Sequence, residues 1–241
     1  MDDFRKPLYD SYVSLFKKPS ENKAHDGARL AQYNRKNFIG LISQYSKDVE
    51  ILDLGCGSGR LLAALQGDGW FNAKGIDVSS EQIVSAVAAG IPAVCEDAFE
   101  YLRKNKGRYH IIFAIDFVEH FSRDEVLTLG QLIFEGLRPG GFLIIQTPNG
   151  KSPFALRNIY GDLTHLCIFS DESIRQWLKG SGFTHIKAES PSIVSLGWKD
   201  KIRGFLRAVI ITLTRLIYFI VTSRREKNIG ENLLVQAKKP G

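Results

Sequence analysis

The chain lacks two features that are typical of secreted proteins and of small proteins stabilised by disulfides or zinc. It has only three cysteines, at positions 56, 95 and 167, and none forms a C-x-x-C element. A disulfide framework or a zinc module needs such pairs, so neither is expected. The N-terminal residues MDDFRKPLYDSY contain no apolar stretch of the kind that a secretory signal requires. We therefore expect a protein of the cytoplasm.

The chain also lacks a concentrated basic face, although it is basic overall. Lys and Arg number 32 against 26 Asp and Glu, which gives a net charge of +6 and a pI near 9.2. Nucleic-acid-binding proteins gather such charge in one stripe or patch. Here the basic residues are spread along the sequence and concentrate only toward the C-terminus. Anionic lipid or solvent is therefore expected to face them, and nucleic acid is not.

Length and composition predict one domain with an embellishment, because 241 residues that are 44% hydrophobic can bury a full core. Between residues 49 and 146 short apolar runs alternate with helical patterns, as in βαβ units with a parallel sheet. The strands expected are Glu50–Asp53, Ala73–Ile76, Ala93–Cys95, His110–Ile115, Phe142–Gln146, Phe183–Glu189 and Asn232–Ala237. The helices expected among them are 58–66, 80–89, 98–104, 123–136 and 171–179. The second of these opens with a capping sequence, SSEQ, and the fourth ends at the break Leu137–Gly141.

Two more helices are expected before the sheet. Apolar side chains recur at helical spacing in Leu8–Phe16 and Leu30–Leu41, and residues Lys18–Gly27 interrupt them. Such helices either form a lid over a bound ligand or cover a sheet edge.

A glycine-rich turn follows the first strand, in the run VEILDLGCGSGR. Gly55, Gly57 and Gly59 leave backbone amides bare, and the helix that follows offers its positive end, so the turn suits a nucleoside-type ligand. Dinucleotide sites have the spacing G-x-G-x-x-G. Arg60 stands where their third glycine would fall, and this disfavours NAD.

The segment DLGCGSG at residues 53–59 closely resembles the S-adenosylmethionine (SAM) loop of class I SAM-dependent methyltransferases, and the resemblance continues to about residue 190. It implies an enzyme with SAM as cofactor and a Rossmann-like, doubly wound, mostly parallel seven-stranded α/β sheet. The chain then divides into an N-terminal helical lid (1–46), a SAM-binding core (47–190), an amphipathic insertion (191–230) and a last strand with its tail (231–241).

The charges and hydroxyls of SAM suggest a partner for each of its parts. Asp53 is placed for the ammonium, and Asp77, which ends the second strand, can accept from both ribose hydroxyls. Asp97 can accept from the adenine amino group while the Ala98 amide donates to the ring, although Asp97 could also cap a helix. The predicted cofactor-binding residues are Asp53, Gly55, Cys56, Gly57, Gly59, Asp77, Val78, Asp97, Ala98, Asp116 and Phe117.

Two further elements suggest the catalytic residues. IDFVEH resembles the D-x-x-E-H element of small-molecule methyltransferases, including the ubiquinone-pathway type, and would place His120 near the transferred methyl. GDLTH-x-x-x-FS is similar to the D-x-T-H segment of methyltransferases found with bacterial polysaccharide and glycolipid biosynthesis. On that analogy His165 or His120 deprotonates an acceptor hydroxyl and Asp162 orients the base or the sugar. Both histidines could instead have structural roles, His120 as a helix cap or a contact of the lid, and His165 as a helix-approach residue.

Two absences narrow the reaction. The N/D-P-P-Y/F element of nucleic-acid amino-methylating enzymes is missing, since DFVE follows the fourth strand. No cluster of carboxylates is spaced to demand a metal ion, and none is expected, because the sulfonium is already an activated leaving group.

Residues 199–225 form a basic, amphipathic segment before the last strand. We expect its apolar run to be too short, and too charged at its centre, to span a membrane. On a helical wheel Ile202, Phe205, Val209 and Leu216 share one face, with arginines and threonines opposite. We expect a helix at the membrane surface. The alternatives are a helix packed on its own sheet and a homodimer contact.

Together these features predict O-methylation of a hydroxyl on a glycan or lipid-linked saccharide, at the inner face of the membrane. The alternatives are a quinone, phenol or natural-product small-molecule O-methyltransferase and a SAM-binding subunit without activity.

Overall fold

The computed structural model describes residues 4–11 and 23–241. The predicted helical positions Tyr12, Leu15 and Phe16 lie outside the described residues.

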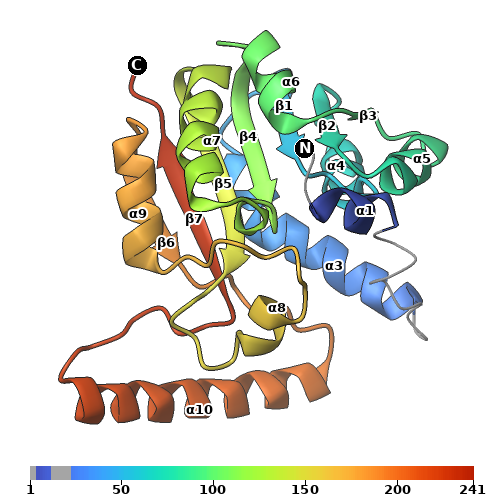
Figure 1. Cartoon of the computed structure of the whole chain (residues 1–241). Helices are drawn as coiled ribbons and strands as arrows, with labels where there is room; N and C mark the ends of the chain where they lie inside the picture. Colours follow the sequence, from blue (N-terminus) through green and yellow to red (C-terminus); the bar gives the residue numbers. More distant parts are fainter. Residues whose placement is uncertain (1–3, 12–22) are drawn as a thin grey trace.

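A seven-stranded sheet with the order β3-β2-β1-β4-β5-β7-β6 forms the centre of the molecule (Figure 1). All neighbouring strands are parallel except β7, which runs antiparallel to β5 and β6. The strands are β1 (Ile51–Leu54), β2 (Ala73–Asp77), β3 (Ala93–Cys95), β4 (Tyr109–Ile115), β5 (Leu137–Pro148), β6 (Thr184–Glu189) and β7 (Asn232–Lys238). The strand order reverses between β1 and β4, which opens a crevice at the carboxyl edge of the sheet. The predicted fold class is confirmed.

Apolar side chains cover both faces of the sheet, since successive residues of a buried strand point to opposite sides. Ile51 belongs to one core with Trp70 and Phe113, while Leu52 belongs to the other with Trp177. The covering helices are α4 (Arg60–Gly67), α5 (Ser80–Ala88), α6 (Ala98–Lys104), α7 (Arg123–Gly136) and α9 (Asp171–Gly180), with shorter pieces at η1 (Ile39–Ile42), η2 (Val118–His120) and α8 (Leu156–Tyr160).

Three local predictions need correction. β5 begins at Leu137 rather than Phe142, because the expected break Leu137–Gly141 lies inside the strand as a shift in register against β4, with Gly140 at a left-handed φ of +75°. Helix α3 (Lys23–Asn37) begins inside the predicted interruption. Ser79 is the N-cap of α5, but its side chain makes no capping hydrogen bond, so SSEQ does not act as a capping sequence.

The first helix, α1 (Arg5–Asp10), is fastened beside the crevice by one buried arginine. The Arg5 guanidinium donates to both carboxylate oxygens of Glu125, at 2.9 and 2.7 Å, and to the His120 carbonyl at 2.8 Å. Arg5 lowers the pKa of Glu125, which also closes the capping box of α7 with Ser122. The start of the chain is therefore held against η2 and α7.

Helix α10 (Trp198–Thr222) lies across the foot of the molecule beneath α8 (Figure 1). None of its residues is buried, and Phe205, Ile217 and Ile220 are 69%, 59% and 70% exposed. Its half-buried positions are Asp200, Gly204, Arg207, Ile211, Thr214 and Tyr218. A helix that packs on its own sheet turns its apolar face inward, so that alternative is wrong. At 25 residues α10 is also long and apolar enough to cross a membrane, which corrects the expectation that it is too short.

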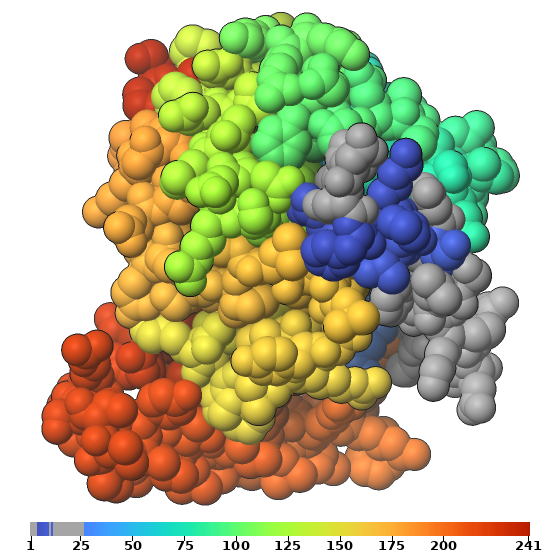
Figure 2. Space-filling model, in the orientation of Figure 1, coloured from blue at the N-terminus to red at the C-terminus, as the bar shows by residue number. Residues whose placement is uncertain are grey.

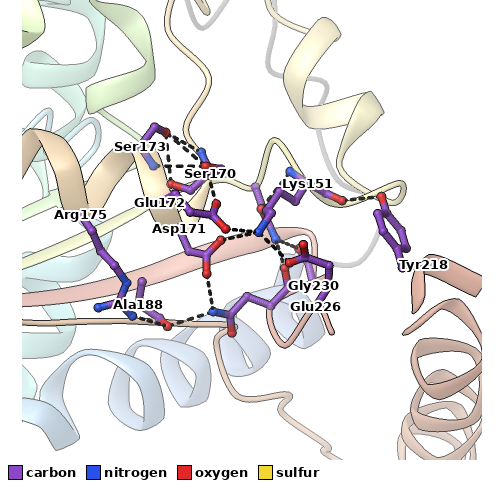
Figure 3. Close-up of polar contacts among 12 residues, drawn as sticks. Lys151, Ser170, Asp171, Glu172, Ser173, Arg175, Ala188, Tyr218, Glu226 and Gly230 are labelled. Atoms are coloured by element: carbon purple, nitrogen blue, oxygen red, sulfur yellow. Dashed lines mark hydrogen bonds and ion pairs between the residues drawn. The ribbon is translucent and has the colours of Figure 1, made fainter. Parts of the chain in front are cut away.

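The far end of α10 is tied to the body through Lys151, shortly after β5 (Figure 3). The Tyr218 hydroxyl donates to the Lys151 carbonyl at 2.8 Å. The Lys151 ammonium lies 3.1, 2.5 and 2.6 Å from the carboxylates of Asp171, Glu172 and Glu226, and it lowers the pKa of Glu172 to about 2. These contacts place α10 on the side of the molecule where the parallel strands end.

Candidate active site

The glycine turn between β1 and α4 has the backbone geometry that only glycine adopts readily. Gly55, Gly57 and Gly59 have φ values of +68°, +55° and +76°. At Gly55 there is a second reason, because a Cβ there would lie 2.5 Å from the ring of Phe117. The turn thus brings backbone against the residues that follow β4, and it leaves no room for side chains.

Asp77 at the end of β2 is held facing this turn. Its Oδ2 accepts a hydrogen bond from the Gly57 amide and its Oδ1 accepts one from the Ser79 amide, both at 2.8 Å. Two backbone donors fix the carboxylate at the switch point of the sheet, where dinucleotide folds also place their ribose-binding acid.

A cavity lies at this point and brings together most of the predicted cofactor-binding residues. It is lined by the predicted Gly55, Asp77, Val78, Asp97, Ala98, Asp116, Phe117 and His120. Tyr9, Ile76, Ser79, Gln82, Glu96 and Phe121 also line it and were not predicted. The predicted Asp53, Cys56, Gly57 and Gly59 do not line it.

Asp53 is only 3% exposed, so a ligand ammonium that binds it has to contact a buried carboxyl group. Burial, with a smaller contribution from Asp77, raises the pKa of Asp53 to about 8. A cation bound nearby would restore the ionised form.

Asp97 is the N-cap of α6, which is the alternative role that the sequence predicted for it. Its Oδ1 accepts from the amides of Phe99 and Glu100, at 2.9 and 3.2 Å, at the start of α6. Because Asp97 also lines the cavity, the cap fixes its position there and the predicted adenine contact is compatible with it.

Asp116 is strained at the end of β4. Its φ of +50° is left-handed, which is uncommon for a residue with a Cβ and tends to occur at functional sites. The Gln146 amide donates to its two carboxylate oxygens at 3.1 and 3.2 Å, and the Tyr33 hydroxyl donates to Gln146 Oε1 at 2.5 Å. α3 and β5 thereby hold the Asp116 carboxylate in place.

Two of the three predicted catalytic residues, His120 and Asp162, come together through Thr164. The Thr164 hydroxyl donates to Asp162 Oδ1 at 2.6 Å, and His120 Nδ1 lies 2.8 Å from the same hydroxyl oxygen. Since the hydroxyl has a single proton, its oxygen accepts from Nδ1–H, and this leaves the lone pair of His120 on Nε2. Burial, with a contribution from His165, lowers the pKa of His120 to about 4, so the imidazole is neutral at pH 7.

His165 and Tyr9 both pack against the His120 ring. The His120 and His165 ring centroids are 4.8 Å apart, and those of His120 and Tyr9 are 6.0 Å apart, both edge to face. His120 therefore does pack against the N-terminal helix, as its structural alternative supposed, while still lining the cavity.

A buried carboxyl group lies beside the two histidines. Glu119 is fully buried, and neither of its carboxylate oxygens has a hydrogen-bond partner of ordinary geometry in the described part of the chain; burial raises its pKa well above the usual range. Donor atoms of Glu119, His120 and His165 lie within 4.8 Å of one another, close enough to share a metal ion. The prediction of no metal rested on the activated sulfonium and on carboxylate spacing, and carboxylate spacing cannot find a set that includes two histidines.

Sequence reasoning missed Thr164, Gln146, Tyr33 and Arg5. Thr164 is the third residue of the quoted D-x-T-H segment, so the signal for it was present. The other three act through contacts between distant segments, and no local pattern marks them.

Comparison with known proteins agrees with this geometry. A family model described as a methyltransferase domain matches residues 9–188. The search of curated proteins found no match.

Among solved structures, a SAM-dependent methyltransferase from Archaeoglobus fulgidus is similar over 98% of this chain and 100% of its own, with 22% identity and a TM-score of 0.66. Haemonchus contortus phosphoethanolamine N-methyltransferase 2 has 15% identity and a TM-score of 0.65 over 97% of this chain and 61% of its own. Burkholderia thailandensis 1,6-didemethyltoxoflavin-N1-methyltransferase has 16% identity and a TM-score of 0.60 over 97% and 88%. At these identities the likeness shows the shared fold.

Proposed function

The chain belongs to the methyltransferase-domain family, as an enzyme that uses SAM, and from this premise we propose that it O-methylates a hydroxyl of a glycan or lipid-linked saccharide at the membrane surface. The cofactor supplies a methyl group on a sulfonium, which is an activated leaving group. The protein has to hold the acceptor oxygen in line with that methyl, and positioning of this kind can supply roughly 7–11 kcal/mol of the barrier.

The observation that carries the proposal is the Asp162–Thr164–His120 chain beside the cavity. A sugar hydroxyl is a poor nucleophile and must lose its proton as it attacks. His120 Nε2 is unprotonated and can take that proton, while Asp162 stabilises the resulting imidazolium through Thr164. His165, at 4.8 Å from the His120 ring, is the second candidate base.

The membrane part of the proposal is supported by α10. Its exposed leucines, isoleucines and phenylalanines face away from the body, and Lys199, Lys201, Arg224 and Lys227 flank them. An apolar helix with basic ends suits an interface with anionic lipid. The space-filling view shows α10 directly below the yellow-to-gold loop between β5 and α9, to which His165 belongs (Figure 2). In this proposal the enzyme works in the cytoplasm, at the inner face of the membrane, and α10 acts there rather than as a homodimer contact.

The experiment is methyl transfer from labelled SAM to a panel of saccharides, quinols and phenols, with wild type, His120→Ala and His165→Ala. Saccharide labelling that falls at least about 10²-fold in one variant supports the proposal. Labelling of phenols or quinols alone would assign the enzyme to the small-molecule alternative. Undiminished transfer in a variant that combines His120→Ala and His165→Ala would show that neither histidine is the catalytic base. SAM binding by the wild type without transfer to any acceptor would favour the non-catalytic alternative.

A further inference from the structure

A second cleft lies between α3 and α10, away from the cofactor cavity. It encloses about 440 Å³ and contains three arginines, Arg29 from α3 and Arg203 and Arg207 from α10. Arg29, Arg207 and Glu231 also line an adjoining hollow that reaches Tyr33 and Gln146. The two hollows therefore adjoin each other and share part of their walls.

The arginines give this cleft a net positive charge. Asp200 and Glu231 are its two acids. Asp200 accepts from the Leu196 amide at 3.0 Å and lies 3.7 Å from the Arg29 guanidinium. Among the side chains that the structure describes, which exclude those of residues 12–26, no carboxylate is at ion-pair distance from Arg203 or Arg207. Guanidinium groups without a carboxylate partner suit a phosphate, which they can bind in a bidentate manner.

The remaining wall of the cleft is apolar. Leu206, Ile210 and Ile211 of α10 line it together with Phe154. Leu206 and Ile210 are also 55% and 51% exposed, so the wall continues into the outward apolar surface of the helix. A ligand that fits must therefore carry an anion and a hydrocarbon chain side by side.

The adjoining hollow lies next to the cofactor cavity. Gln146, which lines the adjoining hollow, donates to Asp116, and Asp116 lines the cofactor cavity near His120. An acceptor anchored in the arginine cleft would therefore hold its sugar beside Tyr33 and Gln146, one hydrogen bond away from the cofactor cavity.

We propose that the cleft between α3 and α10 binds the phosphate or diphosphate of a lipid-linked acceptor, with Arg29, Arg203 and Arg207 on the anion and α10 along the lipid chain. This rests on the proposed function and narrows its substrate class to lipid phosphates. A free sugar phosphate would leave the apolar wall uncovered. An anionic membrane lipid without a sugar would have no group to place beside the cofactor cavity.

The test is binding of farnesyl diphosphate, farnesol and inorganic diphosphate to the full chain, measured by calorimetry. We expect farnesyl diphosphate to bind at least about tenfold more tightly than either of the other two. It alone has both a diphosphate for the arginines and a hydrocarbon chain for the apolar wall. Arg207→Gln should weaken it by about tenfold or more, in line with the loss of a charge-assisted contact, and Arg207→Lys should weaken it less.

Arg215→Gln is the matched control, since Arg215 lies on the same helix but donates to the Lys227 carbonyl and does not line the cleft. It should leave binding within about twofold. Equal binding of inorganic diphosphate or of farnesol overturns the proposal, and so does an unchanged affinity in Arg207→Gln. Equal competition by phosphatidylglycerol vesicles would make the cleft a general lipid contact and also overturn it.

Two further measurements separate this inference from the proposed function. Each variant is titrated with S-adenosylhomocysteine, which should bind all of them alike, and each is assayed on a soluble saccharide. Saccharide methylation without farnesyl diphosphate binding leaves the function standing and removes the inference. If farnesyl diphosphate binds in a manner that depends on Arg207 but no saccharide is methylated, the proposed function is wrong and the cleft remains a lipid-phosphate site.

Discussion

The Nδ1 nitrogen of His120 lies 2.8 Å from the hydroxyl oxygen of Thr164, and this contact fixes which ring nitrogen can take a proton. His120 comes from η2, directly after β4, whereas Thr164 comes from the loop between β5 and α9. The loop is held there because the Glu119 carbonyl accepts from the amides of Leu166 and Cys167, at 2.8 and 3.0 Å. The candidate base is therefore oriented by a loop that is fastened to its own helical turn.

Replacing Thr164 with valine tests this orientation. Thr164→Val keeps the shape of the side chain but removes the hydroxyl oxygen that accepts from His120 Nδ1–H. The tautomer and the ring position of His120 are then no longer fixed. We expect kcat to fall by about 10- to 100-fold, part of the 10²- to 10⁴-fold that a general base typically contributes. The KM for SAM should stay within about twofold, because Thr164 does not line the cofactor cavity.

The matched control is Thr164→Ser, which retains the hydroxyl and should recover most of the rate. An unchanged kcat in the valine variant would contradict the role of Thr164 as a positioning residue.

Chelation tests the expectation that no metal takes part. Transfer from a sulfonium needs no Lewis acid, so activity should be the same in EDTA and in excess Mg²⁺. A loss in EDTA that Mg²⁺ or Zn²⁺ restores would instead assign Glu119, His120 and His165 as metal ligands.

The fold was predictable from the sequence because its signals are local. Each parallel strand is a short apolar run, β1 ends directly before Gly55 and β2 ends in Asp77, so most strand bounds fell within a residue or two. β5 is the exception. Its Pro139–Gly141 segment has the composition of a turn and does leave the register with β4, but it stays attached to the end of β7, since the Gly140 amide donates to the Pro240 carbonyl and the Gly141 carbonyl accepts from the Lys239 amide.

The site was only partly predictable, since some of its contacts join distant segments. Asp77 and Asp116 could be placed from the strands that they end. Arg5 and Tyr33 could not, because their partners Glu125 and Gln146 lie more than a hundred residues away. The outward turn of α10 could not be deduced either, since a helical wheel defines two faces but does not say which one meets the protein.

The raised pKa of Asp53 predicts a pH dependence of SAM binding. In the free protein this carboxyl has a pKa of about 8 and is mostly protonated at pH 6. A bound ammonium favours the carboxylate, so binding releases a proton and affinity should rise by up to tenfold per pH unit from pH 6 to 7.5. Over this range an α-amino group, with a pKa near 7.7–8.0, keeps most of its charge.

Calorimetry in buffers of different ionisation enthalpy measures this proton release directly. Asp53→Asn should bind more weakly and lose most of the pH dependence. Affinity that is flat with pH in the wild-type protein would exclude Asp53 as the partner of the ammonium.

The apolar face of α10 predicts binding to anionic vesicles. Ile217→Glu places a charge on that face, where the side chain is 59% exposed, and should reduce co-sedimentation with phosphatidylglycerol vesicles by at least about tenfold. Leu127→Glu is the matched control, because Leu127 is 61% exposed on α7 and lies outside α10. Equal loss in both variants, or no sedimentation of the wild type, would remove the membrane role.

The most direct test of the account is calorimetric titration of the purified protein with S-adenosylhomocysteine, in wild type and Asp77→Asn. Asp77 is held by the amides of Gly57 and Ser79 at the cavity, so its carboxylate should bind the ribose diol. We predict a single site in the wild type and a loss of about tenfold or more in the variant, at an unchanged melting temperature. Absence of binding to the wild type, or equal affinity in Asp77→Asn, would contradict the central claim that this crevice is the SAM site.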